Sequence, residues 1–238
     1  MHAEILGKRS YVSVMRALKG AMAPTGLLDG EPDVSEERYR HWLQSLFAIY
    51  DIDALIRLDV PWWTYDAIDA VEQFLGQRTG ARVYEYGSGA STVWLTKRAG
   101  KVLSVDHDKD WIEFSAPRLA ELGNATVAHV PADATARPGE RCGSGKSGYS
   151  EQTFTDYVRS IDAHEGQFDL IVIDGRARAA CLRHAAGRLA PNGMIVFDNS
   201  HRRRYRPAIA DSGLGETVLR GLVPSLPLPD QTSLLRQQ

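Results

Sequence analysis

The chain has 238 residues, of which 43% are hydrophobic and 24% are charged, as expected for a globular protein with one large domain and small additions. The formal net charge is −2, so the basic excess typical of nucleic-acid-binding proteins is missing. No apolar run approaches the ~20 residues of a membrane-spanning helix, and no signal-peptide pattern is recognised. The two cysteines, Cys142 and Cys181, lack the spacing of a metal site. We therefore expect a cytoplasmic protein without a nucleic-acid or membrane partner.

Residues 1–63 are predicted to form a helical accessory segment. Apolar residues recur at helical spacing over 5–22, which predicts a helix that lies on the main domain or joins copies of the chain in a homo-oligomer. The Gly- and Pro-containing stretch 25–32 ends this helix. A second amphipathic helix is expected over about 35–50, because its apolar residues recur at three- and four-residue steps.

A cluster of aromatic residues follows this segment. Thr64 is a suitable N-cap for a helix over 65–75, since its hydroxyl can accept a free N–H group of the first turn. Trp62, Trp63 and Tyr65 surround this helix start. Two roles are open for these rings: stacking on an aromatic or cationic ligand, or packing in the core beneath the N-terminal helices.

The most distinctive pattern is a short strand that ends in Gly-x-Gly before a helical segment. The strand is expected over 82–86 and the turn at Gly87-Ser88-Gly89, where glycines let the backbone turn tightly and approach a ligand. Glu85 lies two residues before the first glycine, where its carboxylate would repel a pyrophosphate but attract a cationic ligand. Thr92 stands in place of the third glycine of the dinucleotide fingerprint. Both features favour S-adenosylmethionine (SAM), which carries an ammonium and a sulfonium, over a dinucleotide.

From residue 81 onward, strands and helices alternate, which predicts a doubly wound parallel sheet. Asp106 ends the second strand, 17 residues after Gly89, a distance at which an acid reaches the hydroxyl pair of a ribose. The fourth strand is a nearly continuous apolar run, which suits a strand buried on both faces, and a helix over about 177–189 should follow it. The strands after the first are expected at 101–106, 125–130, 168–174, 194–197, 216–222 and 232–235.

The segment 133–166 is too long for a simple turn between two of these strands. Its glycine-rich first half, 137–148, contains Gly145-Lys146-Ser147, which hints at a phosphate-binding loop. A P-loop needs a glycine five residues before Gly145 and must directly follow a strand, whereas Glu140 stands there. The segment is therefore interpreted as a loop, with a lid over the substrate as the functional alternative.

Taken together, these motifs resemble those of the class I SAM-dependent methyltransferases, over residues 64–238. The resemblance implies an α/β fold with a Rossmann-like, doubly wound, mostly parallel seven-stranded sheet, an antiparallel last strand and an N-terminal helical addition. It also implies SAM as the cofactor and a small molecule as the methyl acceptor. Asp133 matches the usual adenine contact of the family. The cofactor-binding residues that the resemblance implies are Glu85, Gly87, Ser88, Gly89, Ser91, Asp106, His107, Asp133 and Asp174.

Polar residues after the fourth and fifth strands resemble a subgroup, the catechol-type metal-dependent O-methyltransferases. Asp174, Asp198 and Asn199 match the Asp, Asp and Asn that hold a magnesium-like ion there, and such hard oxygen ligands suit Mg²⁺. The chain departs from the subgroup at Ala177, where a lysine is usual. The alternative is that the two Asp residues cap helices or orient the substrate without a metal.

Three residues beyond these strand ends are candidates for catalysis. His201 is the first choice of general base, because its ordinary pKa allows it to accept a proton near neutral pH, and Asp174 is the alternative base. Arg176 is expected to contact the substrate. The arginine-rich run 202–206 either binds an acidic group of the substrate or forms a solvated surface.

The sequence therefore predicts a SAM-dependent methyltransferase, with oxygen as the first choice of acceptor atom and nitrogen as the second. The alternative from another class is a catalytically silent SAM-binding or scaffold protein. An NAD-dependent oxidoreductase is disfavoured by Glu85 and Thr92.

Overall fold

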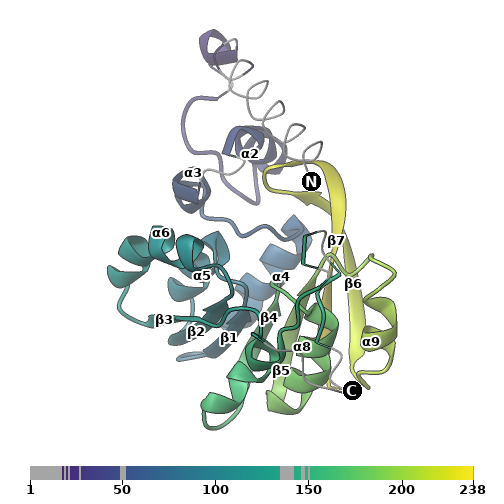
Figure 1. Cartoon of the computed structure of the whole chain (residues 1–238). Coiled ribbons are helices and arrows are strands. Elements are labelled where there is room, and N and C mark those ends of the chain that lie inside the picture. Colours follow the sequence, from purple (N-terminus) through teal and green to yellow (C-terminus); the bar gives the residue numbers. More distant parts are fainter. Residues whose placement is uncertain are drawn as a thin grey trace.

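The computed structural model describes residues 18, 20, 22–26, 28–48, 52–134, 142–145, 148–149 and 151–237. The strands are β1 (Arg82–Tyr86), β2 (Lys101–Asp106), β3 (Ala125–His129), β4 (Phe168–Ile173), β5 (Leu189–Asp198), β6 (Gly215–Val223) and β7 (Leu226–Arg236). They form one sheet of seven strands in the order β3-β2-β1-β4-β5-β7-β6 (Figure 1). β1 to β5 are parallel, whereas β7 pairs antiparallel with both β5 and β6. The predicted Rossmann-like, mostly parallel α/β sheet with an antiparallel last strand is confirmed.

The strand order creates a switch point between β1 and β4. From β1 the chain continues to β2 and β3 on one side, and from β4 it continues to β5 on the other side. Tyr86 lies opposite Val105 of β2 and Ile173 of β4, and Ile173 lies opposite Phe197 of β5. The carboxyl ends of these four strands therefore meet at one edge. In open α/β sheets, ligands bind beyond that edge, at the switch point.

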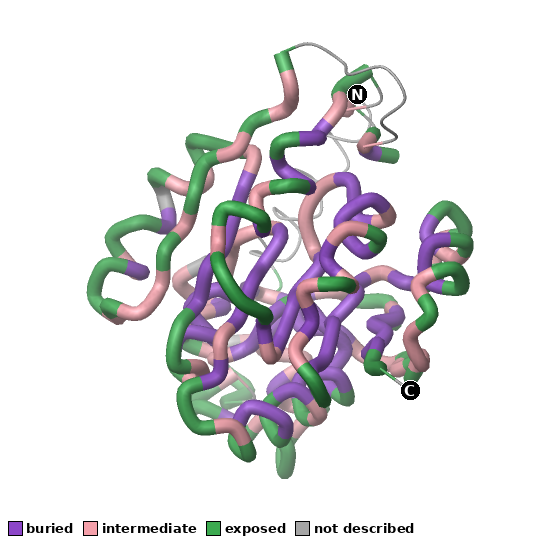
Figure 2. Tube along the Cα trace, turned by 90° about the horizontal axis from the view of Figure 1, so that it is seen from below, coloured by how far each residue is buried: buried purple, intermediate pink, exposed green. Residues whose placement is uncertain are grey.

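Helices cover both faces of the sheet, and the described ones are α2 (Arg38–Ser45), α3 (Ile52–Arg57), α4 (Tyr65–Gly76), α5 (Ala90–Thr96), α6 (Lys109–Ala120), α7 (Thr155–Arg159), α8 (Arg178–Ala185) and α9 (Arg206–Ala210). Successive residues of each strand point to opposite faces. In β4, Ile171 and Ile173 join a core with α7, α8 and α9, while Leu170 and Val172 join a second core with α4 and α5. Figure 2 shows the buried residues along the central strands. β4 is thus buried on both faces, as predicted.

The helix predicted over 35–50 is shorter in the structure. The carboxylate of Asp33 accepts the N–H groups of Ser35 and Glu36, each at 2.8 Å, so Asp33 rather than Ser35 organises the start of this region. α2 then begins at Arg38, and its last turn tightens into a short 3-10 helix. Sequence periodicity indicated a helix here but did not locate its buried face or the turn that delays it, because His41 and Ser45 are buried in α2 whereas Tyr39 is 79% exposed.

Thr64 occupies the N-cap position of α4, as predicted, but its side chain makes no capping hydrogen bond. Its main-chain carbonyl accepts the N–H groups of Ala67 and Ile68. Its own N–H donates to the hydroxyl of Thr232 in β7, at 3.2 Å. The start of α4 is therefore tied to the sheet through the backbone of Thr64.

The C-terminal elements differ from the prediction at their ends. α8 ends at Ala185 and β5 begins at Leu189, because Leu189 pairs with Phe168 before the register shifts. β6 and β7 are longer than predicted and form a hairpin through Pro224-Ser225. Ser225 has a φ of 65°, the left-handed conformation that tight hairpin turns use.

The described part of the N-terminal segment packs on the tip of this hairpin (Figure 1). Nε1–H of Trp42 in α2 donates to the carbonyl of Leu226 at 3.0 Å, and the N–H of Ser225 donates to Oγ of Ser45 at 2.9 Å. The helix predicted over 5–22 lies largely outside the described residues. The domain boundary after residue 63 and the homo-oligomer stay predictions.

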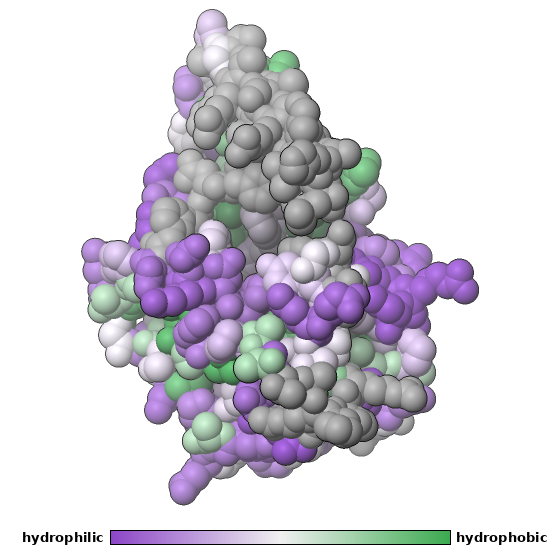
Figure 3. All heavy atoms as spheres, in the orientation of Figure 1, coloured by the Kyte–Doolittle hydropathy of each residue, from purple (hydrophilic) through white to green (hydrophobic). Residues whose placement is uncertain are grey.

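Hydrophilic side chains dominate much of the face in Figure 3, and the hydrophobic areas between them are small. Across the described ranges, no helix combines the length and the apolar character needed to cross a membrane.

Candidate active site

A cavity of about 640 Å³ opens at the carboxyl ends of β1, β2, β4 and β5, a volume within the range of small-molecule sites. Leu55 and Trp62 reach it from the N-terminal segment, and Leu226 and Asp230 reach it from the β6–β7 hairpin. The predicted site residues that line it are Gly87, Ser88, Gly89, Ser91, Asp106, His107, Asp174, Arg176, Asp198 and Asn199.

The floor of the cavity is a close contact between two glycine turns. Gly87 has a φ of 102°, which side chains strongly disfavour. A Cβ atom at Gly87 would lie 2.7 Å from the Cα and N atoms of Gly175, after β4. The glycine at the end of β1 is therefore needed both for its conformation and for the approach of the neighbouring turn.

Glu85 lies behind this turn and not in the cavity wall. Its side chain is fully buried, and its carboxylate accepts hydrogen bonds from the hydroxyls of Ser91, Thr92 and Ser104 at 2.5, 2.6 and 2.7 Å. Burial raises the pKa of Glu85 to about 7, against these hydrogen bonds. Thr92 also accepts the N–H of Gly89, so the residue that replaces the third glycine joins β1 to the start of α5. The predicted direct contact of Glu85 with the cofactor stays a prediction.

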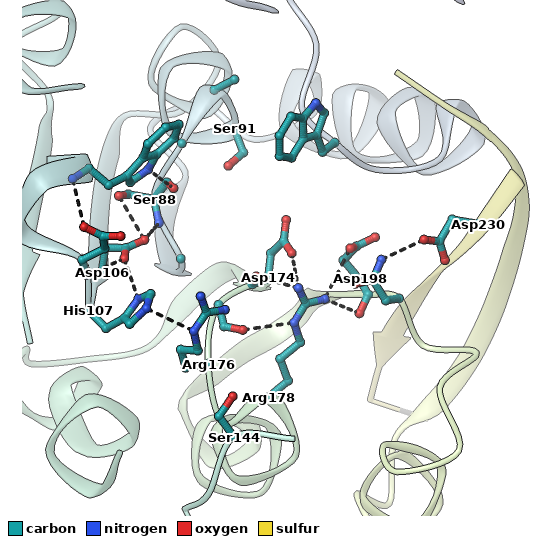
Figure 4. Close-up of a pocket in the computed structure, with 18 of the residues that line it drawn as sticks. Ser88, Ser91, Asp106, His107, Ser144, Asp174, Arg176, Arg178, Asp198 and Asp230 are labelled. Carbon is teal, nitrogen blue, oxygen red and sulfur yellow. Dashed lines mark hydrogen bonds and ion pairs between the residues drawn. The ribbon is translucent and has the colours of Figure 1, made fainter. Parts of the chain in front are cut away.

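Asp106 lines the cavity at the end of β2, as predicted, and Figure 4 shows it beside Ser88 and His107. One carboxylate oxygen accepts the N–H of Ser88 at 2.9 Å, and the other accepts the N–H of Asp108 at 3.0 Å and contacts Nδ1 of His107 at 2.9 Å. Burial alone would raise the pKa of Asp106, but the bonds from His107 and Asp108 hold it below its usual value. A carboxylate that stays ionised is suited to accept hydrogen bonds from hydroxyl groups.

Trp111 of α6 completes this side of the cavity, although no sequence motif marked it as a site residue. Its Nε1–H donates to the carbonyl of Ser88 at 2.8 Å, and its ring lines the cavity. Asp133 lies outside the lining. Its carboxylate accepts the N–H groups of Thr155 and Asp156 at 2.7 and 3.1 Å, so it caps α7. The predicted adenine contact at Asp133 stays a prediction.

On the opposite side, Asp174 and Asp198 converge on the guanidinium of Arg178 (Figure 4). Arg178 approaches a carboxylate oxygen of Asp174 at 2.6 Å and one of Asp198 at 3.3 Å, and it also donates to their main-chain carbonyls. The side chain of Arg178 is only 9% exposed. An arginine thus stands between the two carboxylates that were expected to hold Mg²⁺.

The predicted magnesium site at Asp174, Asp198 and Asn199 gains no support from this arrangement and stays a prediction. Among the residues with described positions, no three His, Cys, Asp or Glu side chains are grouped as metal ligands. A guanidinium already supplies positive charge to both carboxylates. The sequence did contain Arg178, but nothing in its spacing showed that its side chain would turn back between the ends of β4 and β5.

Burial raises the pKa of both carboxyl groups in this cluster. For Asp198, burial and the neighbouring Asp174 raise the pKa to about 7, although Arg178 opposes them and Thr232 donates a hydrogen bond at 3.0 Å. For Asp174, burial raises the pKa, and Arg178 opposes the shift. Groups with such shifted pKa values are typical of functional sites, and of structural ion pairs as well.

His201 does not line the cavity, and its side chain is half exposed. Its Nδ1 lies 2.8 Å from a carboxylate oxygen of Asp230, which does line the cavity. Asp230 also accepts a hydrogen bond from the side-chain amide of Asn199 at 2.9 Å. Asp230 was missed by the sequence analysis, because only the antiparallel pairing of β7 with β5 brings it beside the residues after β5.

Arg176 lines the cavity between its two sides. Its Nε lies 3.1 Å from Nε2 of His107, and its guanidinium lies 4.4 Å from the ring centre of Tyr149. Tyr149 belongs to the segment between β3 and α7. Ser144 of the same segment also borders the cavity. Much of the predicted loop or lid over 137–148 lies outside the described residues.

The three aromatic residues before α4 divide between the two roles left open for them. Trp63 and Tyr65 are buried in the core, where Trp63 packs edge-on against Trp94 and the hydroxyl of Tyr65 contacts Nδ1 of His41. Trp62 is 37% exposed and lines the cavity.

Comparison with known proteins identifies a methyltransferase domain within the chain. Residues 84–200 match the family described as a methyltransferase domain, and no curated protein matches the chain. A methyltransferase-like protein from Silicibacter pomeroyi is similar in structure, with 22% identity, a TM-score of 0.51, and coverage of 72% of this chain and 86% of that chain.

Two further solved structures are similar to the chain with lower scores. An rRNA methylase from Streptococcus thermophilus has 12% identity, a TM-score of 0.49, and coverage of 72% of this chain and 96% of that chain. The N-methyltransferase NodS from Bradyrhizobium japonicum WM9 has 15% identity, a TM-score of 0.47, and coverage of 72% and 94%. The domain match and the sheet order confirm the predicted resemblance to the class I SAM-dependent methyltransferases.

Proposed function

We propose that this enzyme transfers a methyl group from SAM to a hydroxyl group of a small molecule, without a metal ion. The observation that carries the proposal is the cavity at the switch point, which brings an ionised acid after β2 together with a polar cluster after β4 and β5. An amine as acceptor is the second choice. The predicted absence of a nucleic-acid partner and the cytoplasmic location also remain proposals.

The residues on the Asp106 side fit the cofactor. The Asp106 carboxylate is suited to accept hydrogen bonds from the ribose hydroxyls, and the ring of Trp111 offers an apolar surface beside it. The close contact of Gly87 with Gly175 leaves backbone, not side chains, at the floor of the cavity. When bound, SAM supplies an electrophilic methyl group on a positively charged sulfur.

The residues on the other side fit a hydroxyl acceptor. A hydroxyl oxygen that takes up a methyl group must give its proton to a base. We assign this role to His201. Asp230 contacts Nδ1 of the ring, which leaves Nε2 as the nitrogen that accepts the proton and makes Asp230 a positioning residue. Arg178 holds the Asp174 and Asp198 carboxylates in place beside this centre.

The proposal is tested in two steps with the whole chain. First, binding of SAM and of S-adenosylhomocysteine (SAH) is measured by calorimetry. Second, SAM labelled in its methyl group is incubated with a panel of small hydroxyl and amine compounds, and labelled products are identified by mass spectrometry. We expect SAH binding and a labelled methyl ether. A methylated amine would correct the acceptor atom, and SAH binding with no turnover on any compound would favour a silent SAM-binding protein.

The role of His201 is tested with the acceptor that this panel identifies. His201→Gln should lower kcat by roughly 10²–10⁴-fold, the usual contribution of a general base, and should leave the affinity for SAH unchanged. His184→Gln is the matched control, because His184 also pairs with an aspartate, Asp162, but on α8 and outside the cavity lining. Near-native kcat in His201→Gln would exclude His201 and leave Asp174 or Asp198 as the base.

A further inference from the structure

The arginine-rich run after β5 divides into two groups in the structure. Arg202 and Arg204 line the cavity. Arg206 is held away from it by two 2.7 Å hydrogen bonds to the carboxylate of Glu216 in β6. Arg203 is exposed and does not belong to the lining. Two cationic side chains of one short loop therefore face the same cavity as the proposed transfer centre.

The carboxylates that line the cavity all have hydrogen-bond or ion-pair partners. Asp174 and Asp198 pair with Arg178, and Asp230 contacts His201 and Asn199. On the cofactor side, the carboxylates of Asp106 and Asp108 accept main-chain N–H groups.

The positive charges of Arg202 and Arg204 have no such partner. Within the described part of the chain, neither guanidinium lies within ion-pair distance of a carboxylate, and Arg204 contacts the ring and the hydroxyl of Tyr205. Burial raises the pKa of Asp174, and Arg178 and Arg202 oppose that shift, which indicates that Arg202 acts on the interior of the cavity. Among the described residues, Arg202 and Arg204 are therefore guanidinium groups of the cavity lining that have no ion-pair partner.

Arg204 is also held in place before any ligand arrives. Its guanidinium carbon lies 4.8 Å from the ring centre of Tyr205, and it donates to the Tyr205 hydroxyl at 3.2 Å. Its aliphatic part lies against Gly145, where an added Cβ would be 2.6 Å from Cδ of Arg204. A guanidinium fixed by stacking loses less freedom when it binds a ligand, and its fork geometry matches a carboxylate or a phosphate.

We infer that the methyl acceptor carries an anionic group, a carboxylate or a phosphate, which Arg202 and Arg204 bind at the acceptor end of the cavity. The inference rests on the proposed function, because it names the class of acceptor for that same site. The anionic group then positions the hydroxyl that reacts, and neutral alcohols of the same size are poor acceptors.

The test uses the whole chain saturated with SAH and three probes of similar size: benzoate, phenyl phosphate and the neutral benzamide. Binding is measured by calorimetry. We expect saturable binding of at least one anion, binding of benzamide at least tenfold weaker, and a loss of at least tenfold in anion affinity in the double variant Arg202→Gln/Arg204→Gln. The preferred anion tells whether the acceptor is a carboxylate or a phosphate.

Arg203→Gln is the matched control, because it removes the same charge from the same loop without touching the cavity, and it should keep anion binding. SAH affinity is measured first in every variant, which shows that the fold and the cofactor side are intact. If the native chain does not bind SAH, the proposed function fails. If SAH binds but neither anion saturates, or if Arg203→Gln loses as much affinity as the double variant, the inference about the acceptor is overturned.

Discussion

At the scale of single residues, Asp106 is the side chain whose role can be tested most directly. Its carboxylate faces the cavity and its pKa is held below the usual range. Asp106→Asn keeps the size of the side chain but removes the charge. We expect SAM and SAH to bind more weakly by about 1.5–3 kcal/mol, the contribution of hydrogen bonds to a charged group, as measured by calorimetry.

Asp110→Asn is the control for this experiment, because Asp110 lies in the first turn of the same helix, α6, and is exposed outside the lining. Denaturant unfolding of both variants checks that the turn around Ser88 survives. Unchanged cofactor affinity in Asp106→Asn would remove Asp106 from the binding site.

The raised pKa of Glu85 makes the stability of the protein depend on pH. Its pKa is raised from 4.5 to about 7 by burial. Between these values the unfolded chain has lost this proton while the native chain keeps it, so stability falls as the pH rises through that window. The loss from this one group is on the order of 3 kcal/mol, and it is absent below pH 4.5.

Glu85→Gln should remove this loss, because the amide keeps the shape but does not titrate. We expect the free energy of unfolding of the variant, relative to that of the native chain, to increase as the pH rises from about 4.5 to about 7. It is measured by urea unfolding at constant ionic strength. Glu165→Gln, which changes an exposed glutamate, is the control. Its stability should depend on pH in the same way as that of the native chain. If the stability difference between Glu85→Gln and the native chain is constant with pH, Glu85 titrates normally in the folded protein.

At the scale of elements, Arg178 joins the ends of β4 and β5. Arg178→Met leaves Asp174 and Asp198 buried without a counter-charge, which should cost about 3–5 kcal/mol of stability at neutral pH. Acid should restore part of this loss, because protonated carboxyls no longer need the guanidinium. Unfolding in urea at two pH values measures both effects. Arg183→Met, on the exposed side of the same helix, serves as the control. Equal stability of the two variants would show that Asp174 and Asp198 do not need Arg178 as a counter-charge.

The elements also show what the sequence could and could not predict. β1, β2 and β4 were placed closely, because their apolar runs end at recognisable residues such as Gly87 and Asp106. The starts of α2 and β5 were misplaced, because Asp33 caps a turn and Leu189 pairs across the sheet with Phe168. The start of β5 depends on a contact across the sheet that no local pattern encodes, whereas the turn at Asp33 is local and was overlooked in favour of Ser35.

The same distinction applies to the site. Residues at the end of a strand or directly after it, such as Asp106 and Asp174, were found because parallel strands end at one edge. Asp230 and the inward turn of Arg178 were missed, since both depend on tertiary packing. The magnesium prediction matched residue types along the chain and took no account of Arg178, which brings a positive charge from α8 between Asp174 and Asp198.

At the scale of the whole molecule, the cavity connects parts of the chain that are far apart in sequence. Trp62 precedes α4, Asp106 ends β2, Asp198 ends β5 and Leu226 begins β7. The same hairpin supports α2 through Trp42. A ligand that fills this cavity contacts surfaces that unfolding would separate, so binding and global stability must be linked.

We therefore expect SAH at about one hundred times its Kd to raise the free energy of unfolding by about 2.7 kcal/mol, measured by urea unfolding with and without SAH. Because Arg178 already lies between Asp174 and Asp198, the gain should be the same in excess EDTA and in millimolar Mg²⁺. Turnover on the identified acceptor should likewise be the same in both. A chelator that abolishes turnover, with Mg²⁺ restoring it, would show that Arg178 yields its place to a metal ion when substrate binds.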